Sequence, residues 1–352
     1  MKASIKQRDI IINIKAAKDI LSYILKNFEG FIEIGEYSHS PTYSIVIHNS
    51  LTNIPSNAIS ITDSSVKYNP MITFDSIHSE IWLDDTQNLN RNQQLSFYII
   101  SNIYSKVLYN DGYIFLHSSC IDKDGYAVAI CGEKNTGKTV NQLTLLEQGY
   151  NFITNDMLAI KLYNDELVCH GIPYYIGIRM TKPWICESTN KKYVDLALAR
   201  NFKFKAQGGE LDENKFYISP RKLMEINNTE IRSQSTLVAI LNPYYNNATE
   251  ININKLNILN ASKLINSQIL NPVHETKPFL ADLKTLNPNA MQLSQTKTLN
   301  KLLSLPVFNF NSNTNIKSDL QFFVENLYNY QASKNKTTNK SCRFGENEDK
   351  TM

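Results

Sequence analysis

The sequence predicts an α/β protein in which an N-terminal α/β module precedes a core organised around a phosphate-binding loop, or P-loop. Three observations favour this fold class. First, residues 132–139 match the pattern G-x-x-x-x-G-K-[ST] and lie between a strand-like run and a helical run. Second, strand-like and helical runs alternate along residues 1–89. Third, 352 residues with 42% hydrophobic and 20% charged side chains are enough to form a sizeable core.

The N-terminal α/β accessory module is expected at residues 1–89. Runs at 10–14, 31–34 and 43–47 predict strands, and residues 17–28 predict a helix with one apolar face. We expect the P-loop domain at 90–331. Residues 332–352 are predicted to be a disordered tail, because they are rich in Lys, Asn, Thr and Glu and nearly free of large apolar side chains.

The core is predicted to begin with a helix over 90–110 and a strand over 113–121. Asp124-Gly125 separates that strand from the apolar run at 126–131 and predicts a hairpin, because a type I′ turn needs positive φ at both central residues. Continued to its end, this register places His117 opposite Gly132, at the mouth of the loop. His117 is therefore a candidate catalytic residue, although a lone strand histidine also serves in packing.

The loop is the strongest functional signal in the chain. Its backbone N–H groups and those of the following helix would face an anionic phosphate chain. Lys138 would reach the β- and γ-phosphates, and the Thr139 hydroxyl would bind Mg²⁺. The alternative is a plain glycine-containing turn, but the strand before the motif and the helix ending near Gly149 favour a nucleotide site. We expect the whole motif to hold the nucleotide: Gly132, Glu133, Lys134, Asn135, Thr136, Gly137, Lys138 and Thr139.

Residues 151–162 predict a strand that returns beside the motif strand and contains a polar notch, Thr154-Asn155-Asp156. A carboxylate buried in such a strand is costly unless a cation or a proton-transfer partner uses it. In a nucleotide site, Mg²⁺ would be the partner of Asp156. The alternative is a bulge or a surface step.

Taken in order, several short stretches resemble the HPr kinase/phosphorylase-like family, which belongs to the phosphoenolpyruvate-carboxykinase-like group of P-loop kinases. They are Leu116-His117, Asp124-Gly125, the loop motif, Gly149-Tyr150 and Thr154-Asn155-Asp156, with weaker support from Gly171-Ile172-Pro173, Arg179 and residues 217–220. The resemblance covers residues 110–180 well and 180–310 loosely. It implies a core of that fold, ATP and Mg²⁺ as nucleotide and metal, and a Ser or Thr hydroxyl of a peptide or small protein as phosphate acceptor.

The chain departs from the family pattern at two points. The family carries two adjacent aspartates, the first taken as the general base, and Asn155 stands at that first position here. Asp156 matches the second aspartate and would bind Mg²⁺, act as the base or do both, with His117 as an alternative base. The Glu-Ile-Arg-Gly stretch of the bifunctional enzyme is not evident after Asp156.

The predicted function is therefore an ATP-dependent, peptide-modifying kinase whose catalytic residues are His117, Lys138 and Asp156, with Thr139 and Asp156 at the metal. The alternative, which Asn155 keeps open, is a nucleotide-binding assembly or regulatory module with little or no transfer activity. Further along the chain, Lys215 and Arg221 flank the predicted strand at 217–220. These two residues would either neutralise charge on the transferring phosphate or lie at the surface.

Composition limits the expected partners. A formal net charge of +3 is too weak to indicate nucleic acid, and the five cysteines lack the spacing of a zinc site or a disulfide framework. No run approaches the length of a membrane-spanning helix. We expect a cytoplasmic protein with a nucleotide and a peptide or small protein as partners, and with neither nucleic acid nor membrane. A homo-oligomer stays open.

Overall fold

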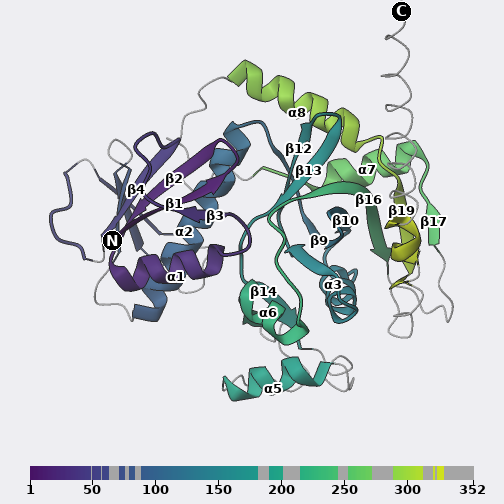
Figure 1. The fold of residues 1–352 in the computed structure, drawn as a ribbon, viewed down its shortest axis with the longest axis horizontal. Helices are drawn as coiled ribbons and strands as arrows, with labels where there is room; N and C mark the ends of the chain where they lie inside the picture. Colours follow the sequence, from purple (N-terminus) through teal and green to yellow (C-terminus); the bar gives the residue numbers. More distant parts are fainter. Residues whose placement is uncertain are drawn as a thin grey trace, which may run out of the picture.

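The computed structural model describes residues 1–48, 50–56, 58–62, 71–75, 79–83, 89–180, 190–200, 215–244, 253–271, 288–311, 320–321 and 323–328. The chain has the mixed α/β architecture that the sequence predicts, and most of its described strands form two large sheets (Figure 1). The predicted disordered tail at 332–352 lies outside the described residues.

The first sheet is built from the N-terminal part of the chain, and its strand order is β3-β1-β2-β4-β7-β6-β5. Its strands are β1 (Lys2–Gln7), β2 (Ile10–Lys15), β3 (Glu33–Gly35), β4 (Tyr43–His48), β5 (Ile59–Thr62), β6 (Met71–Asp75) and β7 (Glu80–Trp82). The strands predicted at 10–14 and 43–47 are confirmed to within one residue, and the one predicted at 31–34 begins two residues late. The predicted helix at 17–28 is α1 (Lys18–Phe28), whose apolar face is buried.

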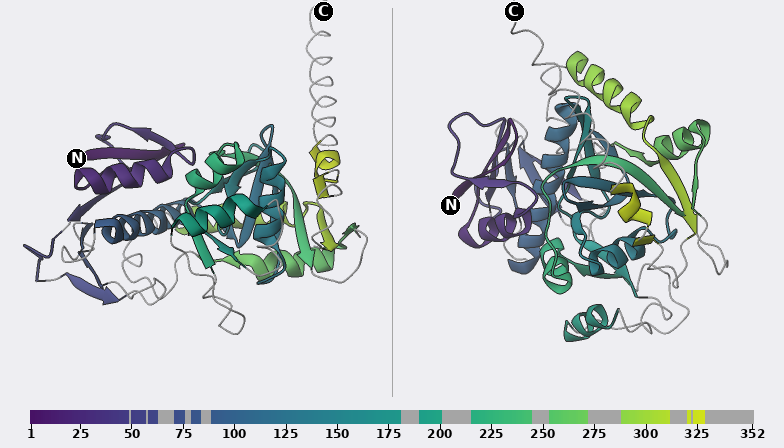
Figure 2. Two further views of the ribbon diagram at one scale, coloured as in Figure 1. Left: turned by 90° about the horizontal axis from the view of Figure 1, so that it is seen from below. Right: turned by 45° about the vertical axis from the view of Figure 1, so that its right-hand side comes forward.

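A long helix, α2 (Leu89–Asn110), runs beneath the first sheet and α1 toward the second sheet (Figures 1 and 2). Aromatic rings join these elements: Phe28 of α1 packs edge-on against Phe97 and Tyr104 of α2, with ring centroids 5.7 and 6.1 Å apart. Phe31 packs in the same way against Phe152 of the second sheet, at 6.1 Å. One apolar cluster therefore includes side chains from both sheets.

The second sheet follows the order β11-β9-β10-β16-β13-β12-β8-β18, and β19 pairs with both β16 and β17. Its strands are β8 (Ile114–Leu116), β9 (Ser118–Lys123), β10 (Tyr126–Cys131), β11 (Asn151–Thr154), β12 (Leu158–Tyr163), β13 (Glu166–Gly171), β16 (Ser235–Tyr244), β17 (Ile253–Lys255), β18 (Ile269–Leu270) and β19 (Val307–Asn311). A separate two-stranded ribbon consists of β14 (Ile176–Arg179) and β15 (Lys215–Ile218). The helices are α3 (Lys138–Glu147), α5 (Lys191–Ala199), α6 (Pro220–Asn227), α7 (Ile258–Gln268) and α8 (Pro288–Leu302).

The predicted hairpin before the motif is present. Asp124 and Gly125 have φ values of 54° and 86°, as a type I′ turn requires. The β9–β10 ladder runs from Lys123 opposite Tyr126 to Ser118 opposite Cys131, which is the predicted register. His117 lies one residue beyond the last pair of this ladder.

Two predicted strands are each divided in the structure. The strand expected over 113–121 breaks at His117, so that β8 pairs with β12 and β18 while β9 pairs with β10 and β11. The strand expected over 151–162 breaks between β11 and β12. Apolar side chains are buried on both sides of each break, so the hydrophobic run continues although the pairing partner changes. The expectation that β11 lies beside the motif strand is wrong, because β9 lies between β11 and β10.

A close backbone approach fixes the end of β13 against β11. A Cβ atom on Gly171 would lie 1.8 Å from the Ile153 carbonyl oxygen, so only glycine fits at this position. The Thr154 hydroxyl, at the end of β11, donates to the Met157 carbonyl at 3.0 Å and closes the turn that carries Asn155 and Asp156.

Within the described residues, no helix combines the length and the apolar character needed to cross a membrane. The cysteines in this part of the chain, Cys120, Cys131 and Cys169, are buried free thiols.

Candidate functional site

The glycine-rich motif connects β10 to α3, so the predicted order of strand, loop and helix is observed. Gly137 is the N-cap of α3 and has a φ of 98°, a left-handed conformation that favours glycine. It supplies no side-chain cap. The first N–H groups of a helix have no partner within the helix, so those of α3 are positioned to bind an anion.

Lys138 extends over the loop that precedes it. Its Nζ donates to the carbonyl oxygens of Gly132, at 2.7 Å, and Glu133, at 3.0 Å. Burial lowers the pKa of Lys138 from its ordinary value, and the nearby Asp156 carboxylate opposes that shift. The Lys138 ammonium is therefore fixed at the loop by two carbonyl acceptors. Phosphate oxygens would replace these acceptors if an anion bound there.

Thr139 contacts the residue that departs from the family pattern. Its hydroxyl donates to Asn155 Oδ1 at 3.2 Å, and the Ser119 hydroxyl holds the Asn155 carbonyl at 2.9 Å. Asn155 is buried, whereas the Asp156 side chain is 53% exposed. The expectation of a buried carboxylate in this notch is therefore wrong, because the chain turns at Asn155 and directs Asp156 outward. The alternative of a surface step describes the position of Asp156, but its carboxylate also acts electrostatically on the loop lysine, Lys138.

His117 lies at the break between β8 and β9, where its backbone N–H donates to the Gln268 carbonyl at 2.8 Å. In the amide orientation that satisfies its surroundings, the Gln268 side chain donates to Gly132 at 3.1 Å and to the His117 carbonyl at 3.3 Å. A glutamine at the end of α7, which sequence reasoning missed, thus connects His117 to the first residue of the loop. Strand pairing was expected to make that connection.

The His117 imidazole faces Asp156, with Nε2 4.0 Å from Oδ1. Burial lowers the pKa of His117, the Lys138 ammonium lowers it further, and Asp156 opposes both. Because the ordinary pKa of histidine is about 6.5, the ring is neutral at pH 7 and can accept a proton.

These residues meet in one cavity of about 650 Å³. Of the residues predicted from the sequence, it is lined by His117, Lys134, Asn135, Gly137, Lys138, Thr139 and Asp156. The other predicted loop residues are not part of the lining. Gly132 and Glu133 instead accept hydrogen bonds from Lys138, and the Thr136 hydroxyl donates to the Glu133 carbonyl at 3.0 Å.

A further wall of the cavity comes from the β14–β15 ribbon and the segment before it, and includes Tyr175, Gly177, Arg179, Lys215 and Tyr217. The Arg179 guanidinium donates to Asn135 Oδ1 and so connects the wall to the loop. The Tyr175 hydroxyl contacts that of Tyr23 on α1. The sequence pointed to Arg179 and Lys215, but no periodicity or motif showed that they share a wall.

Arg221 lies elsewhere. Its guanidinium pairs with Glu29 of α1 and, at 3.5 Å, with Glu225 of its own helix. Of the two roles considered for Arg221, surface placement is the one the structure supports.

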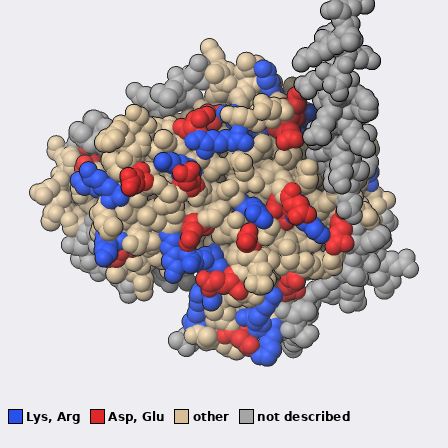
Figure 3. Space-filling model, viewed as in Figure 1, with Lys and Arg blue, Asp and Glu red and all other residues tan. Residues whose placement is uncertain are grey.

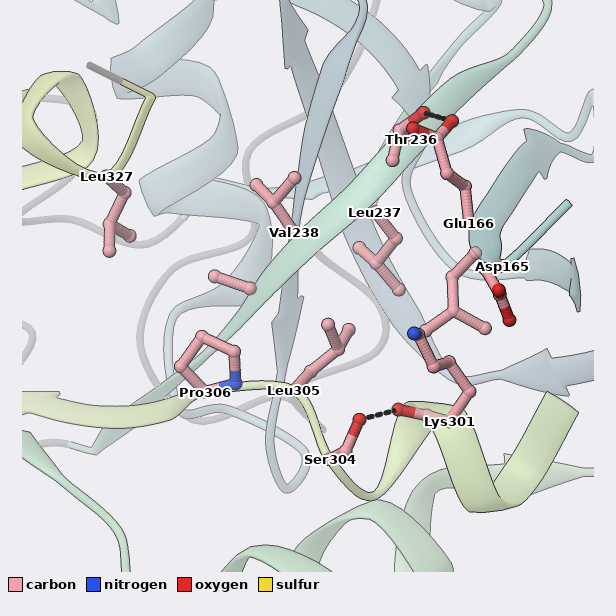
Figure 4. Close-up of a pocket in the computed structure, with 12 residues that line it drawn as sticks. Asp165, Glu166, Thr236, Leu237, Val238, Lys301, Ser304, Leu305, Pro306 and Leu327 are labelled. Atoms are coloured by element: carbon pink, nitrogen blue, oxygen red, sulfur yellow. Dashed lines mark hydrogen bonds between the residues drawn. The ribbon is translucent and has the colours of Figure 1, made fainter. Parts of the chain in front are cut away.

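A second cavity, of about 330 Å³, lies beside β16 and the turn after α8 (Figure 4). Its lining is largely aliphatic and includes Leu237, Val238 and Leu305. Its hydroxyls already have partners, because Thr236 donates to Glu166 at 3.1 Å and Ser304 to the Lys301 carbonyl at 2.6 Å. We assign no chemistry to this cavity.

No protein-family model matches the sequence, and no curated protein matches it. Among solved structures, the HPr(Ser) kinase/phosphatase from Coxiella burnetii is similar over 66% of this chain and 98% of its own. The sequence identity is 15% and the TM-score is 0.32. At that score the similarity is too weak to indicate a shared fold, site or function.

Proposed function

We propose that this protein is an ATP-dependent kinase that transfers the γ-phosphate to a hydroxyl, of serine or threonine, on a peptide or small protein. The observation that carries the proposal is the gathering of five elements in one cavity: the open N-terminus of α3, Lys138, Thr139, His117 and Asp156. Together they supply anion binding, a fixed cation, oxygen ligands and a neutral base.

The residues present fit a nucleotide with its metal. The helix N-terminus and Lys138 would hold the phosphates, and the rest of residues 132–139 would surround them. Mg²⁺ prefers oxygen ligands, and the Thr139 hydroxyl, the Asp156 carboxylate and the Asn155 amide oxygen are available. When bound, the ion would neutralise charge on the phosphates.

The transfer requires one bond to form and one to break. The acceptor oxygen bonds to the γ-phosphorus, the bond from that phosphorus to the β–γ bridging oxygen breaks, and ADP leaves with the electron pair. The acceptor proton would pass to the His117 imidazole, because its lowered pKa favours the neutral ring at pH 7. The Asp156 carboxylate, 4.0 Å from this ring, is the alternative base. A loose transition state needs little help from a base, so Lys138 and Asp156 contribute mainly by placing charge.

The test is incubation of the purified chain with ATP labelled on the γ-phosphate and a panel of serine- and threonine-containing peptides. Label that appears on a peptide hydroxyl supports the proposal. Label that appears only as inorganic phosphate, or not at all, favours the second candidate.

That second candidate is a nucleotide-binding assembly or regulatory module with little or no transfer. The observation in its favour is Asn155, whose amide oxygen accepts a hydrogen bond from Thr139. The HPr kinase/phosphorylase-like family, which the sequence resembles, carries an aspartate at this position. The variant Asn155→Asp separates the two candidates. A kinase should keep or increase its transfer rate, whereas a module that lost its catalytic carboxylate should gain transfer only in the variant.

A further inference from the structure

Among the described side chains on the face of the molecule in Figure 3, acidic and basic groups are interspersed, so surface charge on this face indicates no particular partner. The interior carries a more specific feature, at the point where the β9–β10 hairpin ends. The last pair of its ladder joins Ser118 to Cys131. The next two residues, His117 and Gly132, begin the candidate site, and Gln268 at the end of α7 contacts both of them.

Gln268 binds both backbone groups of His117. This histidine belongs to neither strand at the break between β8 and β9, and its N–H donates to the Gln268 carbonyl at 2.8 Å. Its carbonyl accepts from the Gln268 side-chain amide at 3.3 Å, and the same amide donates to the Gly132 carbonyl at 3.1 Å. Two carbonyl oxygens cannot hydrogen-bond to each other, whereas an amide has two N–H donors. The amide therefore joins the two chains where the ladder stops.

The backbone on either side of this bridge is fixed. Gln268 is 7% exposed, so its amide is held in the interior. The strand that follows it, β18, pairs with β8, and Ile269 lies opposite Leu116, the residue before His117. The bridge is therefore anchored by strand pairing as well as by the amide itself.

The bridge extends to the groups that would take part in transfer. The Gly132 carbonyl that accepts from Gln268 also accepts from Lys138 Nζ, at 2.7 Å. Lys138 and His117 line the same cavity. Hydrogen bonds through a single amide thus connect the backbone of the candidate base to the cation of the loop. A displacement of about 1 Å at a reacting centre can cost about a hundredfold in rate, so this connection matters for catalysis.

We propose that Gln268 is a positioning residue, which holds His117 in a fixed place relative to the phosphate-binding loop. The inference rests on the proposed function, in which His117 takes the proton of the acceptor hydroxyl. Gln268 is not part of the cavity lining. It therefore acts through His117 and Gly132, and not by contact with the nucleotide or the acceptor.

The experiment measures single-turnover transfer from labelled ATP to a peptide, with the full chain and both substrates at saturation. Gln268→Met keeps the length of the side chain and removes both donors. Gln268→Ala is the second variant, in case the first does not fold, because it leaves space for water at the two carbonyls. The matched control is Gln295→Met: the Gln295 amide on α8 donates to the Tyr113 carbonyl at 3.1 Å, outside the cavity lining.

We expect each Gln268 variant to transfer at least about tenfold more slowly than the wild type, because the histidine is no longer held at the loop. Gln295→Met should transfer like the wild type. In a His117→Ala background, Gln268→Met should cause no further loss, since residues that act as one unit are not additive. An equal loss in both backgrounds would show that Gln268 does not act through His117 and would overturn the inference. Transfer at the wild-type rate by both Gln268 variants would overturn it as well.

A second measurement needs no transfer. The NMR resonance of the His117 ring, identified by its loss in His117→Ala, is followed while a non-hydrolysable ATP analogue and Mg²⁺ are added. The resonance should shift in the wild type and shift less in Gln268→Met. An equal shift in the two proteins, or no shift in a wild type that binds the analogue, would overturn the inference. A wild type that binds the analogue but transfers no phosphate to any peptide would overturn only the proposed function, and the ring resonance would then decide the role of Gln268.

Discussion

Replacing Asp156 by asparagine removes one charge from the cavity and keeps the side-chain shape. The carboxylate lies 4.0 Å from His117 Nε2 and acts on Lys138 as well. Two unit charges 4 Å apart interact by about 1 kcal/mol in water and about 4 kcal/mol at the effective dielectric constant of a protein surface. Because the side chain is 53% exposed, an intermediate value of roughly 2–3 kcal/mol is reasonable for charge that develops during transfer. That corresponds to a loss of about a hundredfold in the rate of transfer.

The assay is single-turnover transfer from labelled ATP to a peptide that the wild type phosphorylates, together with calorimetric ATP binding. We expect Asp156→Asn to bind ATP and to unfold at the wild-type temperature, because a half-exposed carboxylate contributes little to stability. Asp195→Asn is the matched control, since Asp195 is 56% exposed and lies on α5 away from the cavity. Transfer by Asp156→Asn at a rate near that of the wild type would refute the reasoning and remove this residue from the site.

Three further predictions use other parts of the structure. Thr139→Ala should leave the fold intact and raise the Mg²⁺ concentration needed for half-maximal transfer, and an unchanged metal titration would exclude Thr139 as a ligand. Gly171→Ala should destabilise the protein by roughly 4 kcal/mol or more, or prevent folding, because a Cβ atom would lie 1.8 Å from the Ile153 carbonyl oxygen; a urea unfolding curve like that of the wild type would contradict the close approach. Burial lowers the pKa of His170 to about 4, so the unfolded chain binds more protons than the folded one below pH 6.5. The free energy of unfolding should therefore be highest above that pH and fall by up to about 1.4 kcal/mol per pH unit toward pH 4. Urea unfolding at several pH values should show a shallower fall for His170→Gln, and an equal slope would mean that another group is responsible.

Local backbone structure was predicted correctly where a short stretch of sequence determines it. The type I′ turn at Asp124-Gly125 follows from the backbone conformation that these two residues favour. Its register predicted that His117 lies close to the start of the loop. The helix after the loop also ends as expected. Gly149 has a φ of 87°, and the N–H groups of Gly149 and Tyr150 donate to the carbonyls of Leu146 and Leu145, the pattern of a glycine-terminated helix.

The predicted strand bounds were wrong where a strand changes its pairing partner within a continuous apolar run. A hydrophobic pattern reports that residues 113–121 are buried, but it does not report which strand lies beside each of them. The break at His117 and the outward turn at Asp156 are decided by pairing with distant strands. For the same reason the expectation that Asp156 is buried is wrong: Thr154 and Asn155 are the buried residues of the notch, and the Asp156 side chain is half-exposed.

Contacts between residues far apart in the chain could not be predicted from the sequence either. Gln268 comes more than a hundred residues after His117, and no motif marks it as the link between that histidine and the loop. Arg179 and Lys215 become neighbours only because β14 and β15 pair across a long connection. Sequence patterns therefore located the loop and helix of the candidate site, and the three-dimensional fold was needed for the wall that the β14–β15 ribbon supplies.

The measurement that tests the central claim most directly is calorimetric titration of ATP into the wild type and Lys138→Ala, with Lys255→Ala as the control. Lys255 is an exposed lysine on β17, outside the cavity. Each hydrogen bond to a charged group contributes roughly 1.5–3 kcal/mol, so the loss of the Lys138 ammonium should weaken ATP binding by at least about tenfold. The control should bind ATP like the wild type. Unchanged ATP affinity in a folded Lys138→Ala protein would contradict the assignment of this loop as the nucleotide site.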